Sequence, residues 1–472
     1  MIEGLKPYAE YKESGHRWLG SVPTHWSVLP NRALFDEVKD RNHPKEEMLS
    51  VTITRGIVRQ KVLLDGSSKK DSSNLNKGAY KLVQPHDIAY NKMRAWQGAL
   101  GASNLRGIIS PAYVVMRPRK EANPWFYHNL YRTPSFAKEA ERWSYGITSD
   151  MWSLRPEHFK VIGTVLPPPD EQAAIVRFLD HANRKIDGFI RAKRKLIGLL
   201  NEQKQAIIHR AVTRGLHPDV PLKPSGIPWL GDIPMHWGHT RLKFEASHIV
   251  DCLHATPTYR TDGVFPAIRT ADIEPGKVRL EQARKISSAE FQRWTARLKP
   301  EMGDILYSRE GERFGIAANV PADTSLCISQ RMMVFRIRKR QDSEYLMWQL
   351  NCRHVYLQAS LYVIGSTAPH VNVDQIKNFQ LALPPVDEQK AIVEHIRSEC
   401  STINTAIART EREIALMLAY RTRLTADLVT GKLDVREAAA QLPAPPAEPA
   451  AEPSAAALDE PDVFEEGEPE EL

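Results

Sequence analysis

Cysteine is scarce in this sequence, and its distribution argues against a disulfide framework. Four cysteines occur among 472 residues, none in a Cys-x-x-Cys pair and all in the second half. They are typical of free thiols in a reducing compartment. No apolar run follows the first residues, and no stretch approaches the roughly 20 apolar residues of a membrane span. We therefore expect a cytoplasmic protein without a secretory signal or membrane contact.

Recognisable catalytic motifs are also missing. No Gly-x4-Gly-Lys-Ser/Thr loop is present, which excludes a P-loop ATPase. The stretch Asn-Pro-Trp-Phe (123–126) resembles the Asn-Pro-aromatic loop of amino-methyltransferases, but no Gly-rich loop for S-adenosylmethionine stands near it, and Asn-Pro also starts helices. Asp170, Glu202 and Lys204 imitate a nuclease signature, yet one helix would spread them over about 48 Å. A dispersed catalytic site without a motif stays open.

Histidines cluster early in the second half without a standard zinc spacing. The cluster comprises His236, His239, His248, Cys252 and His254. His236 matches His25 of the first half, which has no such neighbours, so we expect a packing role and no bound metal.

Charge is distributed unevenly along the chain. Of the 57 Asp and Glu residues, eleven follow Arg436, where no Lys or Arg occurs. The remainder, with 64 Lys and Arg, carries a net charge of about +18, which favours a polyanionic partner such as nucleic acid. The tail is rich in Pro, Ala and acidic residues and is predicted to be disordered.

Three motifs occur twice, in the same order and at offsets of 211, 217 and 217 residues. They are SGHRWLGSVPTHW (14–26) and SGIPWLGDIPMHW (225–237), LPPPDEQAAIVRFLD (166–180) and LPPVDEQKAIVEHIR (383–397), and AVTRGL (211–216) and LVTGKL (428–433). The chain is a tandem duplication in which each copy has a variable block and a shared block. Since duplication preserves a fold, we expect one scaffold with two different surfaces.

The shared block is predicted to be a long helix with a coiled-coil seam. Asp170 and Asp387 are expected N-caps, preceded by prolines and followed by Glu-Gln in the first turn. Apolar residues then recur at heptad spacing, with Lys193 and Gln203 at two seam positions of the first copy. The predicted seams are Ile175, Leu179, Ala182, Ile186, Phe189, Leu196, Leu200 and Ile207, and Ile392, Ile396, Ile403, Ala406, Ile407, Ile414, Met417, Leu424 and Leu428.

Each long helix has one apolar stripe, and the two copies can cover each other. The order block, helix, block, helix makes the helices antiparallel, with a block at each end and an approximate two-fold axis. The variable blocks mix strand-like runs with helical ones, so the predicted fold class is α+β: two globular domains joined by two long antiparallel coiled-coil helices. The predicted boundaries are 1–165, 166–222, 223–382, 383–435 and 436–472.

The variable blocks carry side chains suited to DNA contacts. Arg can form paired hydrogen bonds with guanine, Asn and Gln with adenine, and Lys can bind phosphate. Segments 143–146 and 365–367 are rich in donors and suit backbone contacts. The predicted DNA-binding residues are Tyr90, Asn91, Lys92, Arg94, Trp96, Gln97, Ser144, Tyr145, Arg269, Ser308, Arg309, Arg313, Gln330 and Arg331.

WLGxxPxHW, LPPxxEQxAI and VTGKL together resemble the specificity subunit of type I restriction-modification systems. AYNKMRAWQGALG and GDILYSREG also resemble sequences in that family's target recognition domains, and the resemblance covers about residues 8–435. The first copy has Val-Thr-Arg-Gly where the second has Val-Thr-Gly-Lys, and the acidic tail is outside the family pattern.

The resemblance implies DNA recognition without catalysis. Each variable block would be a target recognition domain for one half of an asymmetric bipartite DNA site. The helices would set the gap between the halves and dock two methyltransferase subunits; restriction subunits would complete the complex. No cofactor is expected in this chain, since S-adenosylmethionine, ATP and magnesium would belong to the partners. A coiled-coil DNA-binding scaffold without sequence specificity and a self-contained DNA-modifying enzyme remain alternatives.

Overall fold

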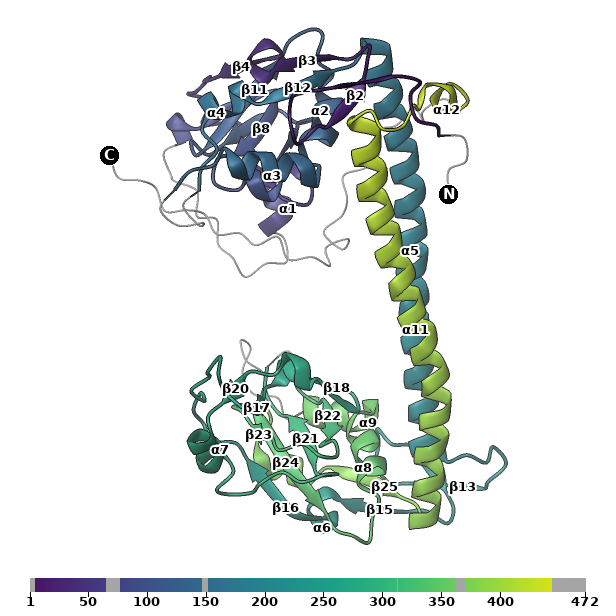
Figure 1. Cartoon of the computed structure of the whole chain (residues 1–472). Helices are drawn as coiled ribbons and strands as arrows, with labels where there is room; N and C mark the ends of the chain where they lie inside the picture. The colour runs from purple at the N-terminus through teal and green to yellow at the C-terminus, as the bar shows by residue number, and fades with distance from the viewer. Residues whose placement is uncertain (1–4, 65–76, 147–151, 312, 362–369, 444–472) are drawn as a thin grey trace. The chain divides into compact units, whose positions relative to one another are not determined.

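The computed structural model describes residues 5–64, 77–146, 152–311, 313–361 and 370–443 (Figure 1). The chain forms two compact units. Unit 1 comprises Met1–Ala192 and Glu413–Leu472, and unit 2 comprises Lys193–Arg412. Each unit contains an α+β domain and about half of each of two long helices. In the described part of the chain, no helix has the length and apolar character of a membrane span.

The two long helices are α5 (Pro169–Arg214) and α11 (Val386–Val429). Both begin two residues earlier than predicted, so Asp170 and Asp387 lie inside the first turn and are not N-caps. Pro169 suits the first helical position because its missing N–H would have had no partner there. The acidic residues of the first turn still interact favourably with the helix dipole.

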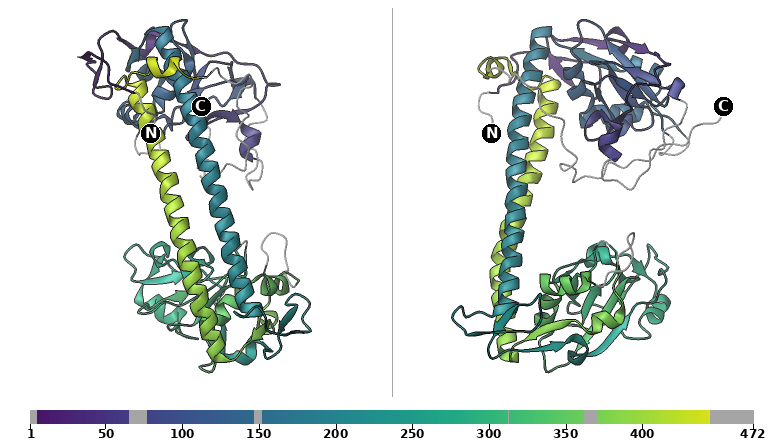
Figure 2. Two further views of the ribbon diagram at one scale, coloured as in Figure 1. Left: turned by 90° about the vertical axis from the view of Figure 1, so that its right-hand side faces the viewer. Right: turned by 180° about the vertical axis from the view of Figure 1, so that it is seen from behind.

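The helices are antiparallel, as predicted. In unit 1 the first half of α5 packs against the last part of α11, where Arg421 forms an ion pair with Asp187. In unit 2 the last half of α5 lies along the first part of α11, and Lys204 Nζ donates to Asn404 Oδ1 at 2.9 Å. Figure 2 shows the pair side by side within each unit.

The seam of α5 differs from the predicted one by one residue in its middle. Ile190 is 6% exposed, whereas the predicted Phe189 and Leu196 are 37% and 39% exposed. Alternating steps of four and three residues from Ile186 reach Ile190, and this heptad spacing keeps one stripe inward. Gln203 is exposed and its neighbour Lys204 is half-buried instead. On α11 the predicted apolar positions are buried or half-buried throughout.

Both domains contain a four-stranded antiparallel sheet with the same strand order. In unit 1 the order is β4 (Phe35–Val38), β11 (Tyr113–Pro118), β8 (Ile88–Asn91) and β9 (Leu100–Ala102). In unit 2 it is β16 (Ala246–Asp251), β24 (Met332–Ile337), β21 (Ile305–Ser308) and β22 (Ala317–Asn319). The prediction that one scaffold carries two divergent sequences is confirmed.

A pair of short helices follows each sheet. They are α2 (Pro124–Tyr131) and α3 (Pro134–Arg142) in unit 1, and α8 (Ser343–Leu350) and α9 (Arg353–Ser360) in unit 2. Each predicted helical run is thus two helices. The chain then returns as β12 (Gly163–Leu166) beside β3 (Ser27–Pro30), or as β25 (Gln380–Leu383) beside β15 (Gly238–Arg241), and enters the long helix.

The repeated motifs meet inside each unit. In unit 1 the buried Glu171 carboxylate accepts hydrogen bonds from Trp26 Nε1 at 2.9 Å and from Tyr8 OH, and His25 Nε2 lies 2.8 Å from its other oxygen. In unit 2, His236 Nε2 lies 2.8 Å from Glu388 Oε2. The Glu of the Glu-Gln motif therefore binds the His-Trp motif in both copies.

The glutamine of the same motif joins the long helix to the domain. Gln172 Oε1 accepts from the backbone N of Asn123, and its Nε2 donates to the carbonyls of Glu121 and Pro167. Gln389 makes two corresponding bonds, since its Oε1 accepts from the backbone N of Asp342 and its Nε2 donates to the carbonyl of Pro384; its third bond goes to the side chain of Gln341. In each copy the bonded backbone N–H belongs to the N-cap residue of the first short helix.

The third repeated motif, at the C-terminal end of each long helix, packs against the tryptophan of the His-Trp motif in the same unit. Gly431 follows α11 with φ +76°, and Gly215 follows α5 with φ +72°. A Cβ on Gly431 would lie 2.4 Å from Cδ of Pro23 and 3.0 Å from Cζ3 of Trp26; one on Gly215 would lie 3.2 Å from Cζ2 of Trp237. The Arg-Gly and Gly-Lys versions of the motif therefore place a glycine at the same structural position, one residue apart in register.

The predicted acidic tail begins later than expected. Residues Arg436–Ala440 form helix α12, Ala439 is buried in the unit 1 core, and Arg177 Nη2 donates to the carbonyl of Leu442 at 2.6 Å. The predicted boundary at 436 is therefore wrong, because this segment has apolar residues that pack. The rest of the tail, 444–472, lies outside the described residues.

Replacing Gly431 by Ala should lower the free energy of unfolding of unit 1 by about 2–4 kcal/mol, because the side chain adds backbone strain and a steric clash. Denaturant unfolding measures the change. Gly20→Ala is the control: Gly20 also has a positive φ, +65°, but no atom lies within 4 Å of its added Cβ, so only about 1 kcal/mol should be lost. Equal losses would contradict close packing at Gly431.

Candidate nucleic-acid interface

The predicted DNA-binding residues of unit 1 lie at the end of β8 and in the loop after it. Tyr90 is an exception to its exposed neighbourhood, because it is 1% exposed and stacks on Phe159 with ring centroids 5.1 Å apart. It belongs to the core and cannot contact a duplex, which corrects the prediction for this residue. Asn91 Oδ1 accepts from the backbone N of Met93 at 3.0 Å and shapes the start of the loop.

The rest of this loop is accessible. Lys92, Arg94 and Trp96 are half-buried and Gln97 is exposed. A short 3-10 turn over 95–97 is formed by backbone hydrogen bonds from Gln97 N to Arg94 O and from Gly98 N to Ala95 O, and Trp96 Nε1 donates to the carbonyl of Met93 at 2.9 Å. This arrangement places cationic and amide groups together on the surface.

A second segment of unit 1 lies beside this loop. Lys92 O accepts from the backbone N of Leu154 at 2.8 Å, and Trp152 contacts Trp96 edge-on at 5.7 Å. Tyr145, which pairs with Ser153, is 61% exposed and contacts the ring of His158 edge-on at 5.2 Å. Ser144 is buried and donates to the carbonyl of Ala140 at 2.7 Å, so its predicted DNA contact is wrong.

Sequence reasoning missed a group of basic residues near Lys92. The buried Lys81 donates to the carbonyls of Pro111 and Tyr113. Burial, and then the positive charges of Lys92, Arg41 and Lys39, lower the pKa of Lys81 to about 8. These three cations therefore lie close enough to Lys81 to oppose its positive charge. In the sequence, these basic residues could have been found in the run Val-Lys-Asp-Arg (38–41), which contains Lys39 and Arg41.

In unit 2 the residues at the end of β21 point inward. Ser308 is fully buried, and Arg309 is 6% exposed. Arg309 Nε lies 3.1 Å from Asp251 Oδ1, and its Nη2 lies 2.6 Å from Glu310 Oε1. A paired, buried guanidinium cannot bind guanine as well, so the predicted base contacts of Ser308 and Arg309 are wrong.

The exposed candidates of unit 2 lie on the turn before β24. Arg331 has φ +70°, rare for a residue with a side chain, and its side chain is 51% exposed. Arg309 N donates to Arg331 O at 3.1 Å, and this bond ties the turn to β21. The neighbouring Gln330 donates from Nε2 to Thr256 Oγ1 at 2.7 Å. The turn thus presents an amide and a guanidinium side by side, in strained backbone typical of binding sites.

Two further arginines of unit 2 are engaged within the domain. Arg269 binds both carboxylate oxygens of Asp272, at 2.9 and 2.8 Å, and this hydrogen bonding raises the pKa of Arg269. Arg313 donates to the carbonyls of Ile273 and Thr270. Both side chains therefore position the segment 269–273, whereas the Arg331 side chain is 51% exposed and its Nε lies 3.8 Å from Glu310 Oε2.

The geometry argues against the two catalytic motifs that the sequence imitates. Asp170, Glu202 and Lys204 all lie on α5 and cannot share a metal ion. Asn123 is the N-cap of α2, accepting from the backbone N of Trp125 at 3.0 Å.

The segment 365–367, which was predicted to suit backbone contacts with DNA, lies outside the described residues.

Comparison with known proteins shows similarity to one family over most of the chain. Residues 254–411 match the family described as "Type I restriction modification DNA specificity domain". The chain is 23% identical over 441 residues to the type I restriction enzyme MjaVIII specificity subunit of Methanocaldococcus jannaschii, covering 90% of this chain and 97% of that protein. It is 23% identical over 453 residues to the EcoKI specificity subunit of Escherichia coli K12, covering 88% and 94%.

A solved structure has the same fold. It comes from work on complex assembly and conformational transition of the type I R-M system, has a TM-score of 0.60 and 16% identity, and covers 86% of this chain and 98% of that one. The family match lies in unit 2 and the first part of α11, while the two relatives extend the similarity across both copies of the repeat. Over most of its length this chain is thus similar to the specificity subunits of type I restriction enzymes, and residues 254–411 match the DNA specificity domain of that family.

Proposed function

We propose that this chain selects the DNA sequence on which a type I restriction-modification complex acts and carries no catalytic site of its own. Each α+β domain reads one half of an asymmetric bipartite site. The observation that carries this proposal is that two sheets of identical strand order present different side chains at corresponding positions. A protein that bound all duplexes equally would not need two divergent surfaces on one scaffold.

Lys92 and Arg309 occupy corresponding positions, directly after β8 and β21. The backbone carbonyl of each accepts a hydrogen bond, Lys92 O from Leu154 N at 2.8 Å and Arg309 O from Val371 N at 3.2 Å. The Lys92 side chain is half-buried and remains accessible, whereas the Arg309 side chain is buried and forms an ion pair with Asp251. The two domains therefore offer different donors, as an asymmetric target requires.

Base readout in unit 1 is assigned to Arg94 and Gln97, and in unit 2 to Gln330 and Arg331. An arginine can form two hydrogen bonds with guanine, and a glutamine two with adenine, in the major groove. Lys92 and the basic residues near Lys81 are assigned to phosphate contacts, which supply affinity and orientation without sequence preference.

The long helices are assigned two tasks, docking two methyltransferase subunits and setting the gap between half-sites. Large apolar side chains are exposed on them: Leu196 and Leu199 of α5 in unit 2, and Leu416 and Leu418 of α11 in unit 1. Leu416 is 69% exposed and Leu199 52%. Apolar side chains outside the seam are suited to partner proteins. S-adenosylmethionine, ATP and magnesium belong to the methyltransferase and restriction subunits in this proposal.

Arg331→Ala should relax discrimination at one base pair of a single half-site, at a cost of about 1–3 kcal/mol, and Arg94→Ala should do so in the other half-site. Binding of the complex with methyltransferase subunits to a panel of single-substitution duplexes measures both. Arg297→Ala, which removes an exposed arginine elsewhere in unit 2, should leave the profile unchanged. Equal weakening on every duplex would instead make Arg331 a phosphate contact, and a wild type that binds all duplexes equally would favour the scaffold alternative.

Arg309→Ala should destabilise unit 2 by about 3–5 kcal/mol and leave base preference unchanged in the folded fraction, because Asp251 and Glu310 lose their buried partner. Denaturant unfolding and the same duplex panel measure the two effects. Arg331→Ala, at a half-exposed position, serves as the stability control and should cost under about 1 kcal/mol. A normal unfolding profile with altered base preference would return Arg309 to the DNA interface.

Removing one heptad from each long helix should shorten the preferred gap by about three base pairs, because seven helical residues span about 10.5 Å. Deleting 200–206 and 401–407 removes facing segments around the Lys204–Asn404 hydrogen bond and keeps the heptad register. Methylation of duplexes with graded gaps measures the change, and unchanged base preference within each half-site is the internal control. An unaltered gap would exclude the helices as its determinant.

A further inference from the structure

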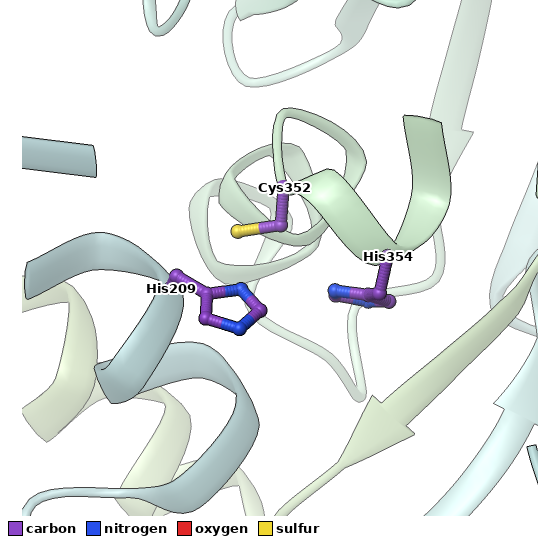
Figure 3. Close-up of side chains that lie close together, drawn as sticks. All are labelled: His209, Cys352 and His354. Carbon is purple, nitrogen blue, oxygen red and sulfur yellow. The ribbon is translucent and has the colours of Figure 1, made fainter. Parts of the chain in front are cut away.

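Three potential metal ligands from two separate elements converge in unit 2. His209 lies on α5, Cys352 precedes α9, and His354 lies in the first turn of α9. One ligand atom from each residue lies within 4.8 Å of the others. In Figure 3 the sulfur of Cys352 and a ring nitrogen of His354 face the ring of His209. This group differs from the histidine cluster noted in the sequence.

The hydrogen bonds around His354 leave it with an unused lone pair. Gln349 Nε2 donates to the carbonyl of Val212 at 2.6 Å, which fixes the amide so that Oε1 is the acceptor. His354 Nε2 lies 3.0 Å from this Oε1 and must carry the proton. The other nitrogen, Nδ1, is therefore unprotonated, and it is buried without a hydrogen-bond partner. A glutamine that orients a histidine in this way is typical of the groups behind a metal ligand.

Unit 1 has no such group at the corresponding place. Thr133, the N-cap of α3, accepts from Phe136 N, and its hydroxyl lies 3.1 Å from that of Ser135. In unit 2, Cys352 takes the N-cap position of α9 and provides no side-chain cap, while His354 stands two residues later, as Ser135 does. The N-cap position of α9 therefore lacks the side-chain hydrogen bond, worth about 1 kcal/mol, that Thr133 provides in unit 1.

We propose that His209, Cys352 and His354 bind a zinc ion, with water in the fourth coordination position. Zinc favours tetrahedral sites of imidazole and thiolate ligands at about 2.0–2.3 Å, which places ligand atoms roughly 3.3–3.6 Å apart. The observed atoms, all within 4.8 Å of one another, need to approach by about 1.5 Å at most, within the reach of side-chain rotation. The ion would join the long helix α5 to the recognition domain of unit 2.

The surroundings permit binding and give the ion a route. Burial, with the charges of Arg214 and Arg353, lowers the pKa of His209. Burial raises the pKa of the Cys352 thiol to about 12, so the ion must displace its proton. His209 also lines a surface pocket of about 410 Å³ together with Thr213 and His217. His209, the exposed member of the group, is therefore accessible from solvent.

The test uses the full chain purified without a histidine tag and stripped with a chelator. Zinc content after reloading should be one ion per chain by mass spectrometry, with a dissociation constant of about 1 µM or tighter. Cobalt should give a tetrahedral visible spectrum and a sulfur-to-cobalt charge-transfer band, because Cys352 supplies a thiolate. Cys352→Ser should remove that band, and His209→Ala should weaken zinc binding at least about 100-fold.

Matched controls distinguish this group from adventitious binding. Cys400→Ser removes another thiol of unit 2, and His254→Ala removes an exposed histidine of the other cluster; both should bind zinc as the wild type does. His209 is on the exposed side of the group, so His209→Ala should fold even if Cys352→Ser does not. Less than about 0.1 zinc per chain in the wild type, no charge-transfer band, or equal loss in the controls would overturn the proposal.

Discussion

The carboxylate at the start of each long helix, buried in unit 1 and partly exposed in unit 2, is the constraint on which both units depend. Glu171 accepts the indole N–H of Trp26, and that indole packs against Gly431 at the end of the other helix. A charged group removed from water requires such partners, because leaving it unpaired would cost several kcal/mol. The start of one helix, the end of the other and the first turn of the domain are thereby bound at one point, which makes the helices antiparallel.

The two copies satisfy this constraint unequally. Tyr8 adds a hydrogen bond to Glu171 in unit 1, and burial together with that carboxylate raises the pKa of Tyr8. In unit 2 the indole N–H of Trp237 is buried without a partner, and Glu388 is more exposed than its counterpart. The second junction is therefore the weaker one by hydrogen bonding. The N-terminal segment that carries Tyr8 belongs to unit 1 and gives it this additional bond.

Periodicity and repetition predicted the architecture because they act along the chain. The helices, their antiparallel order and strands such as β21 and β24 followed from local pattern, whereas the seam at Phe189 was misplaced because Ile190 is equally apolar. Site residues were harder to predict. Tyr90 and Trp96 are both aromatic and six residues apart, yet only contacts with Phe159 show which one is buried. Arg309 points inward because it forms an ion pair with Asp251, which lies on another strand.

The two ends of the described chain meet in unit 1. Lys6 forms a bridge with Asp434, whose N–H donates to the carbonyl of Lys6 at 2.7 Å, and Tyr11 OH donates to the carbonyl of Lys432. The backbone is thus nearly a closed ring. A circularly permuted gene, opened between the two repeats and joined at these ends, would preserve the same contacts. The same fold is therefore expected whichever of the two repeats is synthesised first.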